Sequence, residues 1–336
     1  MWHVGVDLHR KTVVIAAVHD SGEVRPPVRL QNSETERIKD TFFAFGSFRA
    51  VVEATGTYRW FHKLVSPLGT VLLAHPGKLR IMVQRRCKTD TLDAQLLANL
   101  LRINQIPLAY IPPDEYQLLR DITRQRARLV RGQVSVKISL RALLARYNIE
   151  PIFKYPFGPR GLCWLSKQDF GFVDNVVRDE LSARFRHYAA QIEGVNQRLA
   201  KLEAMYPQIE SLTVLRGIGA YTAMVIIGEL GDVRRFRYAK QVASYAGLTA
   251  RVHQSGEHCY HGHISKQGSP WLRWLLVEAA MKLVHQDVPL ANFYQRIRKR
   301  SSAKIARVAA ARKLAEICWK RLVSWERQHH PEVAVA

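Results

Sequence analysis

The chain has 336 residues, of which 47% are hydrophobic, so it is long enough to bury more than one core. Its 51 Lys and Arg against 28 Asp and Glu give a formal net charge of +23, which favours a phosphate polyanion, and hence nucleic acid, as the partner. The sequence has no run of about 20 apolar residues, no signal-peptide core at its start and only four widely scattered cysteines. These features argue against a membrane span, a disulfide framework and a paired-CxxC zinc site, and predict a cytoplasmic protein that binds no membrane.

Residues 1–112 are predicted to form a compact α/β domain with a mixed sheet. Short apolar runs rich in β-branched residues alternate here with helical stretches. The runs predict strands at 2–7, 12–18, 49–54 and 70–74. The segment IPPDEY then interrupts the pattern and marks the end of the domain.

Four acidic residues stand out in this domain. Asp7 and Glu53 each lie at the end of a predicted strand, so both carboxylates should project where the strands end. Asp90 and Asp93 open a helical pattern, and their spacing of three leaves the side chains only about 60° apart around the helix axis. The apolar positions of that helix are Leu92, Leu96, Leu97, Leu100 and Leu101. Acids in a first helical turn can instead merely complement the helix dipole, whereas a charge in the first strand is costly unless something binds it.

Carboxylates that converge in one cleft repel each other unless cations neutralise them, and oxygen ligands favour Mg²⁺ or Mn²⁺ over zinc. Two such ions about 3.5–4 Å apart can stabilise the attacking and the leaving oxygen of a phosphodiester. Together with the positive charge of the chain, the four acids therefore indicate metal-dependent phosphoryl transfer on nucleic acid.

Residues 113–207 are expected to form a helical coiled-coil arm. A long Arg-rich helix is predicted at 114–147 and a second helical stretch at about 178–205, with a loop or hairpin end at 155–164 between them. The apolar stripe of the first helix comprises Leu118, Leu119, Ile122, Leu129, Val136, Leu140 and Leu143. Such arms commonly dimerise, and the alternative use is a solvated basic face over a nucleic-acid backbone. That face would consist of Arg124, Arg126, Arg128 and Arg131.

Residues 208–330 are expected to form a mostly helical domain. The segment LRGIGAYTAMVIIGELG at 215–231 is typical of a helix-hairpin-helix, whose glycines present backbone N–H groups to a phosphate, although an ordinary helical corner has the same local pattern. A polar loop at 253–270 is predicted between two helices, where catalytic groups often lie. Its cluster of His253, His258, Cys259, His261 and His263 fits no zinc-finger spacing.

Six motifs follow one another along the chain: GVD, VVEATGTY, KTDTLDAQLLA, LRGIGAYTAMVIIGELGD, FRYAKQVASYAGLTARVHQSG and ISKQGSPWLRWLL. Over almost the whole chain they resemble, in order, the DEDD-type transposases of the insertion-sequence-110 family, which are related to the Piv-like DNA invertases. The first three resemble the RuvC-like domain of that family, which has the ribonuclease H fold. The last three resemble its carboxy-terminal transposase domain.

The resemblance implies roles for five residues. Asp7, Glu53, Asp90 and Asp93 would form the tetrad that binds Mg²⁺ or Mn²⁺, and Ser255 would be the nucleophile that forms a transient phosphoserine link. The enzyme would cut and exchange strands of donor and target DNA, guided by a structured noncoding bridge RNA from the same element. It would act as a homo-oligomer, a dimer to tetramer, in which different subunits complete each site.

This sequence departs from the family's pattern in places. His9 and Arg10 follow the first Asp where relatives often carry smaller residues, and Ala250 stands where Pro is frequent. Ser265 and Ser269 are rival hydroxyls near the expected nucleophile, so its assignment rests on the motif and not on chemistry.

Three other functions remain open from the sequence. A Holliday-junction-resolvase-like endonuclease would share the fold and the tetrad but would use water in place of Ser255. A sugar kinase or actin-like ATPase also begins with GVD, but this chain lacks the Gly-rich phosphate loops of that class. A non-catalytic nucleic-acid-binding protein would use only the basic surface and the helix-hairpin-helix.

Overall fold

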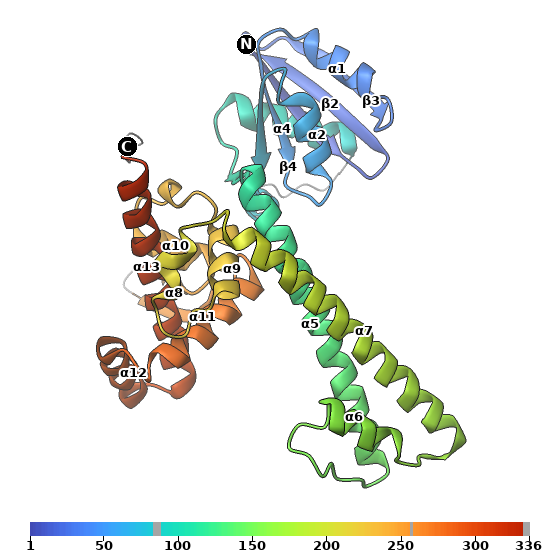
Figure 1. The fold of residues 1–336 in the computed structure, drawn as a ribbon. Coiled ribbons are helices and arrows are strands. Elements are labelled where there is room, and N and C mark those ends of the chain that lie inside the picture. Colours follow the sequence, from blue (N-terminus) through green and yellow to red (C-terminus); the bar gives the residue numbers. More distant parts are fainter. Residues whose placement is uncertain (83–88, 256–257, 332–336) are drawn as a thin grey trace. The chain divides into compact units, whose positions relative to one another are not determined.

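A computed structural model describes residues 1–82, 89–255 and 258–331. The chain divides into two compact units, Met1–Ile111 and Pro112–Ala336, and each has its own hydrophobic core (Figure 1). None of the helices in the described ranges is both long and apolar enough to cross a bilayer.

The first unit is built on a six-stranded sheet in the order β3-β2-β1-β4-β5-β6. The strands are β1 (Trp2–Leu8), β2 (Thr12–His19), β3 (Val24–Gln31), β4 (Phe48–Glu53), β5 (Thr70–Ala74) and β6 (Leu108–Ala109). The pairs β1–β4 and β4–β5 are parallel, whereas β1–β2, β2–β3 and β5–β6 are antiparallel. The sheet is therefore mixed, and the four predicted strands are confirmed to within one residue at each end.

Strand β3 was not predicted from the sequence. It contains Pro26 and Pro27 and alternates charged with apolar residues, and it lies at the edge of the sheet. Proline is tolerated on edge strands and at bulges, and the pairing of β2 with β3 shifts register between Arg25 and Val28, where both prolines lie. The two prolines therefore concealed a strand that its edge position allows.

Helices cover both faces of this sheet (Figure 1). They are α1 (Thr35–Phe43), α2 (Tyr58–Val65), α3 (Pro76–Met82) and α4 (Asp90–Arg102). Helices α1 and α2 bury Phe42 and Phe61 with the strands in one core, whereas α4 packs on β1 and β2 on the opposite face. The result is three layers with the sheet in the middle.

The alternation of side chains along β1 determines what lies on each face. Val4 and Val6 point into the core with α1 and α2, so Gly5 and Asp7 face α4. A Cβ on Gly5 would overlap the backbone of Ala94 and Ala98 in α4. Gly5 therefore allows α4 to lie directly against the strand that ends in Asp7.

The second unit contains a pair of long helices. Helices α5 (Asp114–Arg146) and α7 (Gly171–Glu203) run side by side, and α6 (Pro159–Ser166) packs at the end of the pair (Figure 1). The prediction of a loop throughout 155–164 is wrong, because Pro159 occupies the first position of α6, where proline is favoured. Helix α7 also begins seven residues before its predicted start.

The apolar stripe of α5 agrees with the sequence except at Leu118, whose side chain is 51% exposed. The predicted solvated basic face is also partly wrong. Arg124 pairs with Glu229 on α9 (Ala220–Leu230), and Arg126 donates to Asn196 and stacks on the Tyr221 ring, whereas Arg128 and Arg131 are exposed. Half of that face therefore serves the contacts inside the unit.

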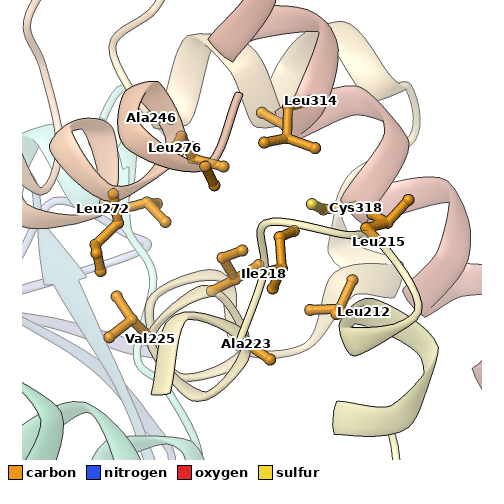
Figure 2. Close-up of a cluster of buried hydrophobic side chains, with 14 of the residues drawn as sticks. Leu212, Leu215, Ile218, Ala223, Val225, Ala246, Leu272, Leu276, Leu314 and Cys318 are labelled. Atoms are coloured by element: carbon orange, nitrogen blue, oxygen red, sulfur yellow. The ribbon is translucent and has the colours of Figure 1, made fainter. Parts of the chain in front are cut away.

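The remaining elements are helices that form a core (Figure 2) and a two-stranded hairpin, β7–β8, that adds no described residue to it. They are α8 (Ile209–Thr213), α9, the 3₁₀ helix η1 (Val233–Arg235), α10 (Ala239–Tyr245), β7 (Ala250–Ser255), β8 (His258–Ile264), α11 (Pro270–Leu283), α12 (Val288–Arg300) and α13 (Ala303–His329). Leu212, Ile218, Leu276 and Leu314 meet in this core beside Cys318, and burial raises the pKa of that thiol to about 12. Cys318 is therefore an apolar packing residue rather than a reactive group.

The segment 253–270 was expected to be a loop between two helices, and this expectation is wrong for its first half. Strands β7 and β8 pair antiparallel as a hairpin, with Ser255 opposite His258. The sequence did not reveal these strands, because ARVHQS and HCYHGHI are mostly polar and lack the apolar run of a buried strand. The hairpin is followed by α11, whose N-cap is Ser269.

An ion pair joins α5 to α9 inside the second unit. Glu229 is only 2% exposed, and Arg124 donates to its two carboxylate oxygens at 2.7 and 2.8 Å. Arg120 donates to the backbone carbonyls of Gly228 and Glu229 at 3.0 and 2.9 Å. The buried carboxylate is therefore paired with a guanidinium and accepts a hydrogen bond on each oxygen, as a buried charge requires.

The packing at Gly5 leads to a stability prediction. Gly5→Ala should lower the free energy of unfolding by about 1–3 kcal/mol or more, because the new methyl meets rigid backbone of α4 and not a movable side chain. Gly56→Ala is the matched control, since Gly56 is exposed and nothing lies within 4 Å of its Cβ position. Urea denaturation, with hydrogen exchange of the α4 amides, measures the difference, and equal stability of the two variants would contradict the packing argument.

Candidate active site

The four acids identified in the sequence line one cleft of the first unit. The cleft has a volume of about 410 Å³, and its walls include Asp7, Glu53, Asp90 and Asp93. They come from β1, β4 and the first turn of α4, three elements that are separate in the sequence. The structure therefore brings all four together, as the sequence analysis expected.

Strand register places the first two carboxylates. Strands β1 and β4 are parallel neighbours with Val6 opposite Val52, so Asp7 and Glu53 occupy the next position on each strand. Side chains alternate along both strands, and Val51 faces α4 in the same core cluster as Leu97. Asp7 and Glu53 therefore emerge on the α4 face, where the paired strands end.

The packing of α4 places the other two carboxylates. Thr89 caps the helix by accepting a hydrogen bond from the Leu92 N–H at 3.2 Å. The face that packs on the sheet contains Ala94, Leu97, Ala98 and Leu101, so the predicted leucine stripe is only partly correct and the two alanines were missed. Asp90 and Asp93 precede Ala94 and Leu97 by one turn and so continue the buried face. The helix therefore presents both acids where it meets the strand ends.

Two basic residues join this cluster. The His9 Nε2 atom lies 3.0 Å from Asp7 Oδ2 and 3.0 Å from Asp90 Oδ1, and Arg29 Nη1 lies 3.2 Å from Asp90 Oδ2. The sequence analysis noted His9 only as a departure from the family's pattern and did not assign Arg29 to the site. The position of His9, two residues after a strand-end acid, was the available signal.

The electrostatics of the cluster favour a bound cation. Burial raises the pKa of Asp7 above its ordinary value of 3.8, the neighbouring Asp90 and Asp93 carboxylates raise it further, and His9 opposes them. A divalent cation would relieve both the desolvation and the repulsion. The carboxylate oxygens and one imidazole nitrogen, arranged around an open cleft, are a donor set that fits Mg²⁺ or Mn²⁺.

Asp7, His9 and Asp90 are the residues whose ligand atoms converge within 4.8 Å of one another, and they form the only such group in the described part of the chain. His258, Cys259 and His263 lie on β8 and are exposed. The described histidines of the hairpin therefore belong to no such cluster.

The expected nucleophile lies in the second unit. Ser255 is the last residue of β7 and pairs with His258, the first residue of β8. Its side chain, like residues 256 and 257, lies outside the described part of the structure.

One rival hydroxyl has a structural task. The Ser269 hydroxyl accepts a hydrogen bond from the Leu272 N–H at 3.3 Å and so caps α11. Ser265 follows the hairpin, and among the described residues its hydroxyl accepts a long hydrogen bond of 3.5 Å from the Gln267 N–H. Ser265 is therefore the stronger of the two rivals.

Comparisons with known proteins cover both units. A transposase model of the DEDD IS110 type matches residues 4–149, and a model described as transposase IS116/IS110/IS902 family matches residues 209–295. The chain is 24% identical to a probable family 20 transposase of Pseudomonas aeruginosa over 98% of each chain. It is 24% identical to a transposase for insertion sequence element IS1328 of Yersinia enterocolitica, over 94% of this chain and 95% of the relative.

A third relative is named for gene inversion. The chain is 26% identical to a pilin gene-inverting protein of Moraxella bovis over 84% of this chain and 80% of the relative. The stretch that matches the first family model includes all four cleft acids, and the stretch that matches the second includes Ser255 and the hairpin. The chain therefore belongs to the IS110 family of transposases and is a DNA transposase or recombinase.

Proposed function

We propose that this transposase cuts and exchanges strands of donor and target DNA with a carboxylate tetrad and a serine nucleophile. Asp7, Glu53, Asp90 and Asp93 would hold the metal, and Ser255 would attack the phosphodiester. The observation that carries the proposal is the convergence of the four acids, from three separate elements, on one cleft.

The order of strands supports a RuvC-like domain with the ribonuclease H fold for the first unit. Three antiparallel strands, β3, β2 and β1, are followed by the parallel strands β4 and β5. The acids lie at the ends of the two central strands, β1 and β4, and on the helix across them. This is the arrangement that the family resemblance predicts for a nuclease of this fold.

The metal-binding residues of the cleft would come from the sheet and from α4. Asp7 and Glu53 stand on the rigid sheet, so their positions do not depend on a mobile loop. Asp90 and Asp93 complete the ligand set from α4. Bound Mg²⁺ or Mn²⁺ would neutralise the charge that develops on the phosphodiester during cleavage.

Ser255 would supply the covalent step. Its hydroxyl oxygen would form an ester with the phosphorus of one strand end while the deoxyribose oxygen leaves, so the bond energy is kept for strand exchange. Ser255 is the last residue of β7, and its position at a strand end supports a role in which the hydroxyl meets a DNA strand. The alternative is a resolvase-like endonuclease in which water makes the attack and no covalent intermediate forms.

A basic groove in the second unit supports DNA binding near that hairpin. The groove has a volume of about 900 Å³ and lies between β7–β8 and α13. Arg251 and Lys266 contribute from the hairpin side, and Lys304 and Arg312 contribute from α13. None of its described lining residues is acidic, so these four basic side chains, among apolar neighbours, can contact a phosphate backbone.

The segment from α8 to α9 supports a helix-hairpin-helix contact with DNA. Gly217 has φ +118° in the turn, and its Cβ position would lie 3.0 Å from Lys282 Cβ. Gly219 is the N-cap of α9, so the first N–H groups of that helix follow a residue without a side chain. Such a helix start can bind a phosphate.

The remaining partners follow from the family resemblance. We assign to this enzyme a structured bridge RNA, which pairs with donor and target DNA, and a homo-oligomeric state between dimer and tetramer. The net charge of +23 supports binding of both nucleic acids. The reaction is placed in the cytoplasm because a recombinase acts where the chromosome is.

Removing one ligand charge tests the tetrad. Asp7→Asn should reduce DNA cleavage by about two orders of magnitude or more, since a catalytic metal is worth several kcal/mol. Because the pKa of Asp7 is raised in the folded protein, ionising this carboxyl lowers the free energy of unfolding of the metal-free protein. The loss of stability is absent below the ordinary pKa of Asp and complete above the raised pKa. The variant should therefore melt at a higher temperature than the parent at pH 7 without metal, with no difference in acid.

Thermal melting with and without Mn²⁺ completes this test. Mn²⁺ should raise the melting temperature of the parent protein but not that of Asp7→Asn. Asp40→Asn, an exposed acid on α1, is the control and should behave as the parent in cleavage and melting. Unchanged cleavage by Asp7→Asn would remove the tetrad from the mechanism.

A trapped covalent intermediate tests the nucleophile. On a suicide DNA substrate the parent protein should remain attached to one strand end in a denaturing gel, and Ser255→Ala should lose both this adduct and the recombinant product. Ser265→Ala is the matched control, because Ser265 is the rival hydroxyl without a capping role. An adduct in Ser255→Ala but not in Ser265→Ala would transfer the role to Ser265, and product formation by both variants would favour the hydrolytic alternative.

Salt-resistant RNA tests the guide. The affinity for duplex DNA of random sequence should fall steeply as salt rises. A plot of log K against log[salt] should have a slope near −0.9 for each neutralised phosphate. A discrete RNA should stay bound to protein purified from its native cells at salt that strips such duplex. Sequencing the co-purified RNA measures this, and recovery of only heterogeneous fragments would count against a bridge RNA.

A further inference from the structure

The structure points to His9 as a direct ligand of the metal ion, beside Asp7 and Asp90, which makes this centre prefer Mn²⁺ over Mg²⁺. This inference rests on the proposed metal site but goes beyond it, because the expected tetrad consists only of carboxylates. It concerns one side chain and the identity of the ion. The argument begins with three atoms, His9 Nε2, Asp7 Oδ2 and Asp90 Oδ1.

The spacing of these atoms is compatible with three ligands around one ion. His9 Nε2 lies 3.0 Å from each of the two carboxylate oxygens, and the ligand atoms of all three residues lie within 4.8 Å of one another. Adjacent corners of an octahedron with bonds of about 2.1 Å are about 3.0 Å apart. The three side chains can therefore bind one ion with little rearrangement.

Hydrogen bonding alone does not satisfy this arrangement. One imidazole nitrogen either donates a single hydrogen or accepts with a single lone pair. His9 Nε2 therefore makes at most one full hydrogen bond, although Asp7 and Asp90 both approach it at 3.0 Å. A cation at the centre of the three groups would bond to each of them at once.

The backbone holds His9 in this position. Its N–H donates to the Thr12 carbonyl at 2.9 Å, and its carbonyl accepts from Asn32 Nδ2 at 2.9 Å. Both partners belong to the sheet or follow it directly, so the turn between β1 and β2 is tied to the fold on two sides. The imidazole itself is 47% exposed and lines the cleft, so an ion can reach it.

The nitrogen donor determines the preferred ion. Mg²⁺ strongly prefers oxygen ligands and keeps several waters, whereas transition metals accept imidazole readily. Mn²⁺ accepts both carboxylate and imidazole, so a set of Asp7, His9 and Asp90 should bind it more tightly than Mg²⁺. Replacing His9 with a side chain that has no nitrogen ligand should reduce this preference while leaving the carboxylates in place.

Pulsed electron paramagnetic resonance of bound Mn²⁺ tests the bond directly. The parent protein should show the ¹⁴N coupling of a directly coordinated imidazole, and His9→Gln should lose it. His19→Gln is the control, because His19 lies at the far end of β2, opposite Trp2, and should keep the coupling. A parent spectrum without directly coordinated nitrogen would overturn the inference.

Calorimetric titration with Mn²⁺ and Mg²⁺ gives a second readout that is independent of activity. In His9→Gln the affinity for Mn²⁺ should fall about tenfold or more, as for loss of a metal-site group, while the affinity for Mg²⁺ changes much less. An equal loss for both ions would overturn the preference for Mn²⁺. Failure of the parent to bind Mn²⁺ would instead refute the proposed metal site, and binding through Asp7 without nitrogen coupling would refute only the role of His9.

Discussion

The close packing of α4 on β1 is the constraint on which the candidate active site depends. Gly5 has no side chain, and any larger residue would meet the backbone of α4 at Ala94 and Ala98. This contact fixes the height of the helix above the sheet and thereby the distance between Asp7 on the strand and Asp90 on the helix. The same glycine stands two residues before Asp7, so one short segment supplies both a ligand and the space for its partner element.

The two units differ in how far their buried carboxylates are neutralised by neighbouring side chains. Glu229 is neutralised inside the second unit by Arg124, which donates one hydrogen bond to each of its carboxylate oxygens. In the first unit burial and the nearby carboxylates raise the pKa of Asp7, although His9 lies close to it. Glu229 thus links α5 to α9 through its ion pair. The negative charge of the cleft is only partly compensated by nearby side chains, and a metal ion would neutralise the rest. Perturbed groups of this kind concentrate at catalytic centres.

The sequence correctly predicted the strands whose residue pattern is typical of a buried strand. Strands β1, β2, β4 and β5 are buried runs of β-branched residues, and their predicted limits are confirmed to within one residue at each end. Strand β3 was missed because Pro26 and Pro27 resemble a turn, and the hairpin β7–β8 was missed because it is polar. Helix α6 was taken for a loop because Pro159 and its neighbouring glycines resemble a break. For β3 and α6, the prolines lie where proline costs little: on an edge strand and at the first position of a helix.

The sequence by itself determined the positive charge, the strand ends that carry Asp7 and Glu53, and the helix start that carries Asp90 and Asp93, because these depend on composition and local periodicity. Only the tertiary structure decided which groups meet. His9 lies between two carboxylates because the turn after β1 is tied to the edge of the sheet and α4 lies directly against β1. Such contacts join residues far apart in the chain, and their distances are set by how closely helices and strands pack, which no local pattern encodes.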